Sequence, residues 1–315
     1  MLTWRELPAL PQPLGGQFVG VIDGKLIAAG GTYWQGKPWS GGTKYWADTV
    51  YALSPGEAHW KMIGRLPEQL AYGAAVSLDG GMLLIGGQSA RETHGRVWRL
   101  SLKNGSPVVE RMAPLPCACG WMSAAVLDGV VYVAAGGEGW PGATKALRSF
   151  WKLEDGKWSQ LDAWPGPARF FAPMTAAGGS LYMGGGTDLQ DGKRVFLKDA
   201  YRYDPAKGWS RITDLPTALQ GGFAAGTPEG HPLILGGNDG AWADRESHPD
   251  HPGFQREVFE YDPSKQRWIE LGRMPASLVT SGLALWNGEF VIAGGEDRPG
   301  SRSARVIAAR LPATK

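Results

Sequence analysis

The stretch Val291-Ile292-Ala293-Gly294-Gly295 is a short hydrophobic run that ends in a pair of glycines. The same pattern recurs along the chain at intervals of roughly fifty residues. Its copies end at Gly30-Gly31, Gly86-Gly87, Gly136-Gly137, Gly185-Gly186, Gly236-Gly237 and Gly294-Gly295. A period of this length, with two glycines at a strand end, is typical of a β-propeller in which each repeat forms one blade. The sequence therefore predicts an all-β fold with six blades.

A second repeat, in which a Trp precedes a Pro by seven residues, supports the same fold. It occurs at Trp4/Pro11, Trp60/Pro67, Trp158/Pro165, Trp209/Pro216 and Trp268/Pro275, and Val109 takes the Trp position before Pro116. We expect each Trp to begin the last strand of a blade and to bury its ring between neighbouring sheets. The Pro fits where that strand must stop, because it has no N–H for a ladder.

The two chain ends are expected to share one blade. One strand-like run, Arg305 to Arg310, follows the last glycine pair, and no further Trp–Pro copy comes after it. The surplus copy lies at the other end of the chain. We therefore expect residues 3–7 to complete the last blade as its outermost strand, which removes an open sheet edge and makes residues 1–315 a single propeller domain.

The combined pattern of hydrophobic strand, glycine pair, Tyr-containing strand and Trp resembles the kelch repeat. The Tyr strand is clearest at Asp199-Ala200-Tyr201-Arg202-Tyr203-Asp204-Pro205. The resemblance covers the whole chain and implies a six-bladed kelch β-propeller. It leaves the activity open, since one fold can host enzymes and interaction modules alike.

Composition excludes several classes of partner. The chain has 315 residues, 47 of them Gly, and a formal net charge of +2. This charge gives no electrostatic reason to expect binding to nucleic acid or membrane. No apolar run approaches the ~20 residues that span a bilayer. No secretory signal is visible at the N-terminus, so we expect a cytoplasmic protein, or a periplasmic one if the chain is a processed or trimmed form.

Two groups of residues suggest metal or redox chemistry only weakly. Cys117 and Cys119 are too close in sequence to meet disulfide geometry easily, and no further Cys completes a metal set. His248 and His251 lie among acidic residues, but prolines interrupt the segment and prevent a helical ligand face. We expect neither a metal nor another cofactor.

The long loops point to one face of the propeller as the functional face. The loops that follow the glycine pairs lie on the same face as those that follow the prolines. Long insertions occur there, at residues 32–47, 187–198 and 238–257, whereas the turns of the opposite face are short, as at Asp23-Gly24. Loops of this length in a compact repeat are usually functional.

One loop of this face carries a specific motif. The run Gly295-Glu296-Asp297-Arg298-Pro299-Gly300-Ser301-Arg302 resembles the Gly-Glu-x-x-Pro-Gly-x-Arg segment of the bacterial sialic acid mutarotases, or N-acetylneuraminate epimerases, in the branch whose blades are cyclically permuted. Residues 36–46 and His251-Pro252-Gly253-Phe254 resemble two other segments of that family, although Tyr33-Trp34-Gln35 stands where the family usually has Asn-aromatic-Pro. The resemblance implies that Glu296 and Arg302 are the catalytic pair.

The expected reaction fits these residue types. Mutarotation opens a cyclic hemiketal and recloses it on the other face, which needs a base for the anomeric hydroxyl and an acid for the ring oxygen. A carboxyl group such as Glu296 can transfer these protons. Arg302 can bind a sugar carboxylate as a bidentate fork. The predicted function is thus the cofactor-independent interconversion of anomers of an acidic sugar, N-acetylneuraminate first.

Further substrate contacts are expected from the same face. Arg169 and Phe170 can grip an anionic sugar and stack on its ring; alternatively, the aromatic plugs the channel and the Arg caps a carbonyl. Trp34 and Trp46 can form a stacking wall, or pack their loop onto itself. Lys44 and Asn238 complete the expected set. The rival hypothesis is a non-catalytic propeller that binds a glycan or a protein on this face, and the oligomeric state stays open.

Overall fold

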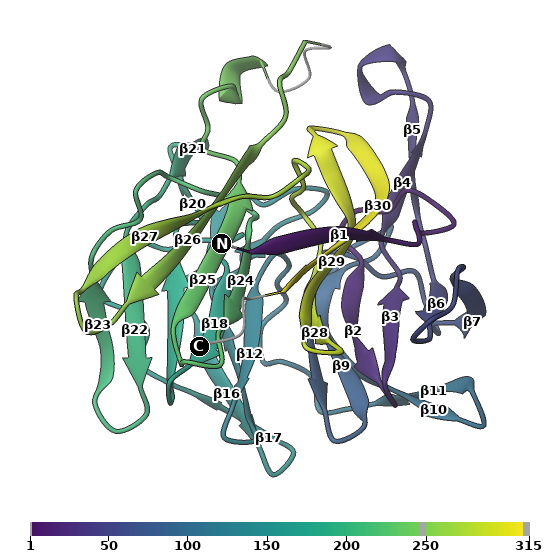
Figure 1. Cartoon of the computed structure of the whole chain (residues 1–315), viewed down its shortest axis with the longest axis horizontal. Helices are drawn as coiled ribbons and strands as arrows, with labels where there is room; N and C mark the ends of the chain where they lie inside the picture. Colours follow the sequence, from purple (N-terminus) through teal and green to yellow (C-terminus); the bar gives the residue numbers. More distant parts are fainter. Residues whose placement is uncertain (1, 246–249, 311–315) are drawn as a thin grey trace.

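The computed structural model describes residues 2–245 and 250–310. In this part of the chain, six four-stranded antiparallel sheets surround a central axis (Figure 1). The first strands of the sheets contact one another around that axis. The prediction of an all-β, six-bladed propeller is confirmed.

The blades are numbered along the chain, and their strands are given from the axis outward. Blades 1 to 3 are β2 (Phe18–Ile22), β3 (Lys25–Ala29), β6 (Thr49–Leu53), β7 (Lys61–Arg65); β8 (Ala74–Leu78), β9 (Gly81–Gln88), β10 (Thr93–Lys103), β11 (Ser106–Arg111); and β12 (Ser123–Leu127), β13 (Val130–Ala134), β16 (Phe150–Glu154), β17 (Lys157–Gln160). Blades 4 to 6 are β18 (Met174–Ala177), β19 (Ser180–Gly184), β22 (Ala200–Asp204), β23 (Gly208–Ile212); β24 (Phe223–Gly226), β25 (Pro232–Gly237), β26 (Gln255–Asp262), β27 (Arg267–Arg273); and β28 (Leu283–Trp286), β29 (Glu289–Arg298), β30 (Ser301–Arg310), β1 (Thr3–Leu7).

The N-terminal strand closes the ring, as the repeat count predicts. β1 pairs with β30 in antiparallel register, from Thr3 opposite Arg310 to Leu7 opposite Val306. The Arg5 guanidinium also reaches across the blade, and its Nε donates to Glu289 at 3.0 Å. Pairing the chain ends in one sheet removes the free edge that the last blade would otherwise expose.

The Trp repeat fastens neighbouring blades to one another. The indole N–H of Trp60 donates to the Pro8 carbonyl at 2.8 Å, and that of Trp268 donates to the Thr213 carbonyl at 2.9 Å. Trp158 makes the equivalent bond to Ala113 at 2.9 Å. Each of these bonds joins the last strand of one blade to the segment that leaves the preceding blade, so each Trp buries apolar area and satisfies its polar group together.

A closed ring of backbone hydrogen bonds encircles the axis, and we call its six residues the axial belt. Each belt residue donates its N–H to the carbonyl of the preceding one at 2.6–3.2 Å, and the ring closes between the first and last members. Its members are Gly16, Tyr72, Trp121, Phe171, Gly221 and Thr280. All six have φ between 56° and 70°, in the left-handed region that is uncommon for residues other than glycine. The ring of bonds fixes this backbone and aims four side chains toward the axis.

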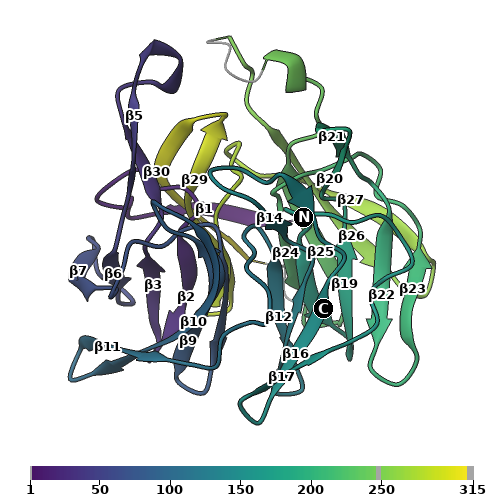
Figure 2. The ribbon, with the colours of Figure 1, turned by 180° about the vertical axis from the view of Figure 1, so that it is seen from behind.

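The two faces of the propeller differ as the loop lengths predict. The arm formed by β4 (Thr32–Gln35), η1 (Pro38–Ser40) and β5 (Thr43–Trp46) projects on the same side as the β29–β30 hairpin (Figures 1 and 2). The hairpin of β20 (Thr187–Gln190) and β21 (Lys193–Phe196), the short pair β14 (Gly137–Glu138) and β15 (Lys145–Ala146), and η2 (Ala243–Arg245) belong to the other loops that follow glycine pairs. None of the helices described is long and apolar enough to cross a membrane.

Candidate functional site

The β29–β30 hairpin places Glu296 and Arg302 opposite one another. Its register pairs the two residues across the strands, so the six-residue spacing of the motif is the spacing of a cross-strand pair. Pro299 and Gly300 form the connection, and Gly300 has a φ of 70°, which favours glycine. The Gly300 N–H donates to Glu296 Oε2 at 3.1 Å. The hairpin turn of the motif therefore fixes the position of the Glu296 carboxylate.

Arg302 also holds the Glu296 carboxylate, as its ion-pair partner. Its Nη1 contacts Glu296 Oε1, and its Nη2 donates to the hydroxyls of Thr32 at 3.0 Å and Tyr72 at 2.7 Å. The side chains of the pair are little exposed, 5% for Arg302 and 15% for Glu296. Gly15 leaves room for the guanidinium, because a Cβ there would lie 2.7 Å from Arg302 Cδ. The ion pair is thus shielded from solvent. Charges interact more strongly in such a buried site than at the surface.

The ion pair forms part of the wall of a cavity on the long-loop face, which we call the upper cavity. It has a volume of about 270 Å³, and residues from the surroundings of all six blades line it. Its charged lining residues are Lys44, Arg194, Arg302 and Glu296, three cations and one carboxylate. The amides of Gln88, Gln220 and Asn238 also line it. The volume suits one small molecule, and the excess of positive charge favours an anionic one.

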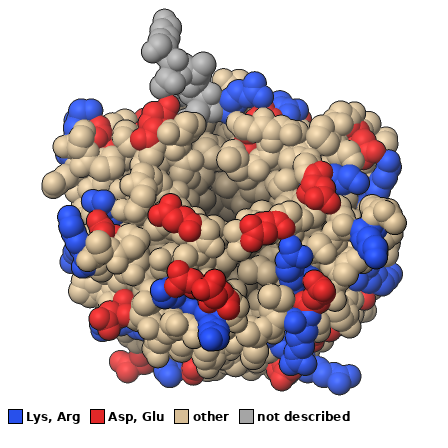
Figure 3. Space-filling model, turned by 90° about the horizontal axis from the view of Figure 1, so that it is seen from below, with Lys and Arg blue, Asp and Glu red and all other residues tan. Residues whose placement is uncertain are grey.

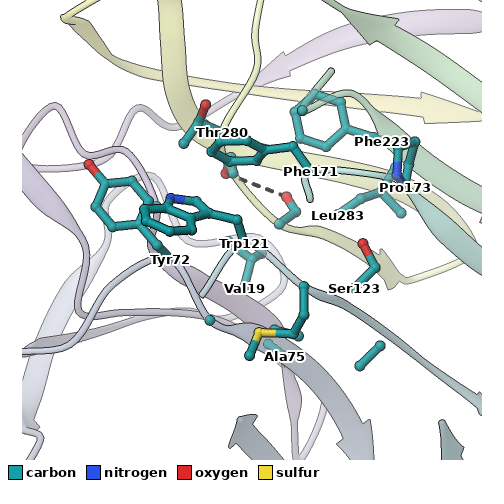
Figure 4. Close-up of a pocket in the computed structure, with 18 of the residues that line it drawn as sticks. Val19, Tyr72, Ala75, Trp121, Ser123, Phe171, Pro173, Phe223, Thr280 and Leu283 are labelled. Carbon is teal, nitrogen blue, oxygen red and sulfur yellow. Dashed lines mark hydrogen bonds between the residues drawn. The ribbon is translucent and has the colours of Figure 1, made fainter. Parts of the chain in front are cut away.

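Axial-belt side chains form the floor of the upper cavity. Tyr72, Trp121, Phe171 and Thr280 line both this cavity and a second cavity of about 180 Å³ nearer the middle of the axis, the central cavity. Figure 4 shows these four side chains close together, with the Tyr72 hydroxyl directed away from the central cavity. The rings pack in tilted pairs, with centroids 6.2 Å apart for Tyr72 and Trp121 and 6.0 Å for Trp121 and Phe171. A rigid aromatic surface therefore separates the two spaces.

The opposite face has a wider opening with a different lining, the lower mouth. Figure 3 shows the hollow at the centre of this face, with acidic side chains near its edge. The lower mouth has a volume of about 780 Å³ and is lined mainly by small residues. Its charged lining residues, Asp128 and Glu229, are both acidic. Among the described residues that line it, none is cationic, whereas charged and amide side chains of both donor and acceptor type converge on the upper cavity, which is the better candidate for the functional site.

Known proteins resemble this chain in both sequence and fold. No family model matches it. An N-acetylneuraminate epimerase of Yersinia enterocolitica is 28% identical over 240 residues, which cover 65% of this chain and 59% of that protein. For one of Haemophilus influenzae the identity is 26% over 220 residues, 61% of this chain and 57% of that protein. N-acetylneuraminate epimerase 1 of an Escherichia coli strain is 38% identical over 99 residues, 28% of this chain and 26% of that protein.

The chain resembles the N-acetylneuraminate epimerases. The matches span less than two thirds of the length of these relatives. Among solved structures, that of YjhT matches 97% of both chains with a TM-score of 0.73 at 15% sequence identity, which shows a common fold.

Several residues predicted to contact a substrate lie at the upper cavity. Trp34, Lys44 and Asn238 line it together with Glu296 and Arg302. Trp46 lies behind this lining, where its ring packs edge-on against Tyr72 at 5.7 Å and lies under the Lys44 ammonium at 4.9 Å. The segment His251–Phe254, one of those that resemble the N-acetylneuraminate epimerases, brings Phe254 to the cavity and buries His251 against it.

Arg169 and Phe170 lie elsewhere, and the expectation that they reach a ligand is corrected. Arg169 is fully buried; its guanidinium donates to Asp199 at 2.6 Å and to the Gly185 carbonyl at 2.7 Å. Nearby Arg169 and Tyr201 hold the pKa of the Asp199 carboxyl below its usual value, although its burial acts in the opposite direction. Phe170 is also buried, and its neighbour Phe171 lines the cavity instead. The alternative of a structural role for this pair is the one that the contacts favour.

We predict that Arg169→Ala destabilises the fold. The substitution leaves the Asp199 carboxylate without its buried partner, and breaking such a pair costs about 3–5 kcal/mol. Urea denaturation should show this loss in the free energy of unfolding. Arg211→Ala is the control, because Arg211 pairs with Asp214 at an exposed site, where an ion pair contributes about 0–1 kcal/mol. Equal stabilities for the two variants would contradict the structural role of Arg169.

The residues considered for metal or redox chemistry form no metal cluster within the ranges 2–245 and 250–310. His248 lies outside the described residues. The ring of His251 packs between Trp242 at 5.7 Å and Phe254 at 5.5 Å. Cys117 and Cys119 are free thiols whose Sγ atoms lie 3.4 Å apart.

Sequence reasoning missed the floor of the cavity, although a signal for it exists. Tyr72, Trp121 and Thr280 each stand five residues after the Pro of the Trp–Pro repeat, and Phe171 stands six residues after its Pro. The Trp–Pro repeat gives the number of blades, but its residue types do not reveal the left-handed backbone of the residue that follows each Pro at this distance. Since each belt residue lies at the axis, this position in every repeat is where cavity-lining side chains should be sought.

Proposed function

We propose that the protein is a cofactor-independent carbohydrate mutarotase that acts on an acidic sugar, with N-acetylneuraminate as the first candidate. The observation that carries the proposal is the Glu296–Arg302 pair on the wall of a small, cation-rich cavity. The names of the relatives described above support the choice of sugar.

Glu296 is assigned the role of proton acceptor. Its contacts with Arg302 and with the Gly300 N–H both favour the ionised carboxylate, the form that can take a proton from the anomeric hydroxyl. As that proton leaves, the bond between the anomeric carbon and the ring oxygen breaks, the ketone forms, and the ring oxygen takes up a proton from an acid in the cavity. When the ring recloses on the other face of the carbonyl, the ring oxygen gives that proton back and Glu296 returns its proton to the carbonyl oxygen, so the reaction needs no net proton or electron.

The other cations of the cavity are assigned to substrate binding. Arg302 already contacts Glu296, Thr32 and Tyr72, whereas Lys44 and Arg194 supply positive charge from two other loops. In this arrangement the sugar carboxylate lies near Lys44 and Arg194. Arg302 attracts the carboxylate by its positive charge but does not bind it through two direct hydrogen bonds. The aromatic floor offers a face for the apolar side of the sugar ring.

The test is a time-resolved proton NMR trace of freshly released α-N-acetylneuraminate relaxing to its β anomer, with and without the protein. We expect the protein to speed the approach to an unchanged equilibrium. An unchanged rate would remove N-acetylneuraminate as substrate and move the test to other acidic and neutral sugars. If no sugar relaxes faster, the mutarotase proposal is wrong, and the rival of a non-catalytic binding propeller takes its place.

A further inference from the structure

Tyr72 is held rigidly at the floor of the upper cavity. It belongs to the axial belt, where its backbone has a φ of 60°. Its ring packs between Trp46 and Trp121, and a Cβ on Gly16 would lie 2.6 Å from a ring carbon. These contacts come from three separate segments, so the ring has one position. The hydroxyl is directed away from the central cavity (Figure 4), and Arg302 of the β29–β30 hairpin donates to it.

The surroundings of the hydroxyl are cationic. Arg302 Nη2 donates to it at 2.7 Å, and the Lys44 ammonium lies 4.6 Å from the centre of the ring. Glu296 lies beyond Arg302 and is paired with it. Arg194 is the other charged residue described that lines the same cavity as the phenol. Burial raises the pKa of Tyr72, but the charges of Arg302 and Lys44 outweigh that effect and bring the pKa below its usual value.

The hydrogen bonds leave the phenol able to donate its proton to a ligand. Arg302 donates to the phenolic oxygen and occupies a lone pair. The hydroxyls of Thr32 and Tyr72 share a hydrogen bond of 2.9 Å in which either can be the donor. The Gly15 carbonyl is a second acceptor for the Thr32 hydroxyl, at 3.1 Å. When Thr32 donates to Gly15, the phenolic hydrogen bonds to Thr32 and reaches a ligand by giving up that bond; when Thr32 donates to Tyr72, the phenolic hydrogen can turn toward the upper cavity, which Tyr72 lines together with Glu296.

We propose that Tyr72 is the second proton-transfer group of the site, the acid that protonates the ring oxygen of the sugar while Glu296 deprotonates the anomeric hydroxyl. This inference rests on the proposed mutarotase function. In the opening step the bond between the anomeric carbon and the ring oxygen breaks, the hydroxyl proton passes to Glu296, and the phenolic proton passes to the ring oxygen. In the closing step the phenolate recovers its proton from that oxygen as the bond re-forms, and Glu296 protonates the carbonyl oxygen. No electron is gained or lost.

The two roles explain why both groups contact Arg302. Tyr72 becomes a phenolate in the open-chain state, and the Arg302 and Lys44 charges stabilise that anion. Glu296 is neutral in the same state, so the total negative charge around Arg302 does not change during the reaction. A single ion-paired carboxylate without a second group would have to carry a proton from one oxygen to the other.

The experiment compares the dependence of kcat/KM on pH in the wild type, Tyr72→Phe and Thr32→Val. In the wild type, kcat/KM should fall on the alkaline side below pH 10, because the phenol loses the proton that it must donate. Tyr72→Phe keeps the ring packing; it should lower kcat/KM about 10²-fold and abolish the alkaline fall. Thr32→Val is the control for lost hydrogen bonding, because it removes a hydroxyl that bonds to both Arg302 Nη2 and the Tyr72 oxygen but carries no titrating proton. This variant should keep the alkaline fall.

The phenolate itself gives a second readout that does not depend on activity. The ultraviolet difference between wild type and Tyr72→Phe should show one tyrosinate forming below pH 10. An alkaline fall that persists in Tyr72→Phe, or the absence of that tyrosinate, would overturn the role of Tyr72 while the mutarotase function stands. Failure of the wild type to speed relaxation of any sugar would instead overturn the function, and the role of Tyr72 with it.

Discussion

Glu296→Gln should lower kcat/KM for anomer interconversion by about 10²–10⁴-fold, the usual contribution of a positioned acid or base. The amide has nearly the shape of the carboxyl group, so the cavity is preserved. It cannot take a proton from the anomeric hydroxyl, and it carries no charge to pair with Arg302. The measurement is the NMR relaxation rate of the sugar at several concentrations, at a temperature well below the unfolding transition of the variant.

Glu138→Gln is the matched control for this prediction. Glu138 also follows a glycine pair, but its side chain is 45% exposed and pairs with Lys145 at 3.4 Å. Its activity should equal that of the wild type. If Glu296→Gln is folded by circular dichroism and keeps more than about a tenth of the activity, the carboxylate is not the proton acceptor.

The contrast between these two glutamates shows what the repeat could not tell. In five blades the second strand ends in two glycines with positive φ. The residue after these glycines then pairs in a β-bridge with the residue that precedes the axial-belt residue, as Glu296 pairs with Val279. In blade 3 the positive φ values fall one residue earlier, on Ala135 at 66° and Gly136 at 114°. Gly137 therefore occupies the position of Glu296, and Glu138 lies one residue further along with a 45% exposed side chain. A one-residue shift in backbone conformation decides which glutamate reaches the cavity.

The fold was predictable because its signals are local. A glycine pair, a Trp and a Pro each reflect the local conformation of the backbone or the position of one strand. Because the pattern occurs six times, one departing copy does not change the predicted fold. The Glu296–Arg302 pair was predictable for the same reason, since both residues belong to one hairpin. The partners of Arg302 were not, because Thr32 and Tyr72 lie 270 and 230 residues away in sequence.

Burial was the other property that the sequence concealed. Arg169 next to two Phe residues has the composition of a sugar site, and only its ion pair with Asp199 reveals a structural role. The ion pair depends on how two loops of blade 4 pack together, and the repeat pattern does not predict that packing. Charged residues near a propeller axis are therefore best assigned only after their buried partners are known.

Arg302→Lys should impair both stability and catalysis, although it keeps the charge. A lysine ammonium is a single point of contact and cannot reach Glu296, Thr32 and Tyr72 together as the planar guanidinium does. Part of the cost of an unpaired buried charge, which reaches about 3–5 kcal/mol when a partner is removed entirely, should appear in the free energy of unfolding. We expect kcat to fall about 10²-fold, since misplacing catalytic groups by about 1 Å can cost that much.

Arg305→Lys is the control for this substitution because it lies on the same strand, β30, and is half exposed beside Glu6. Its urea midpoint and its kcat should match those of the wild type, since exposed ion pairs contribute little. The changes in kcat and in KM separate two roles of Arg302. A fall confined to kcat means that it positions Glu296 and Tyr72, whereas a rise confined to KM means that it binds the sugar carboxylate directly. The contacts of its guanidinium with three protein side chains favour the first result, and a pure KM effect would return Arg302 to the role of carboxylate fork that its sequence motif first suggested.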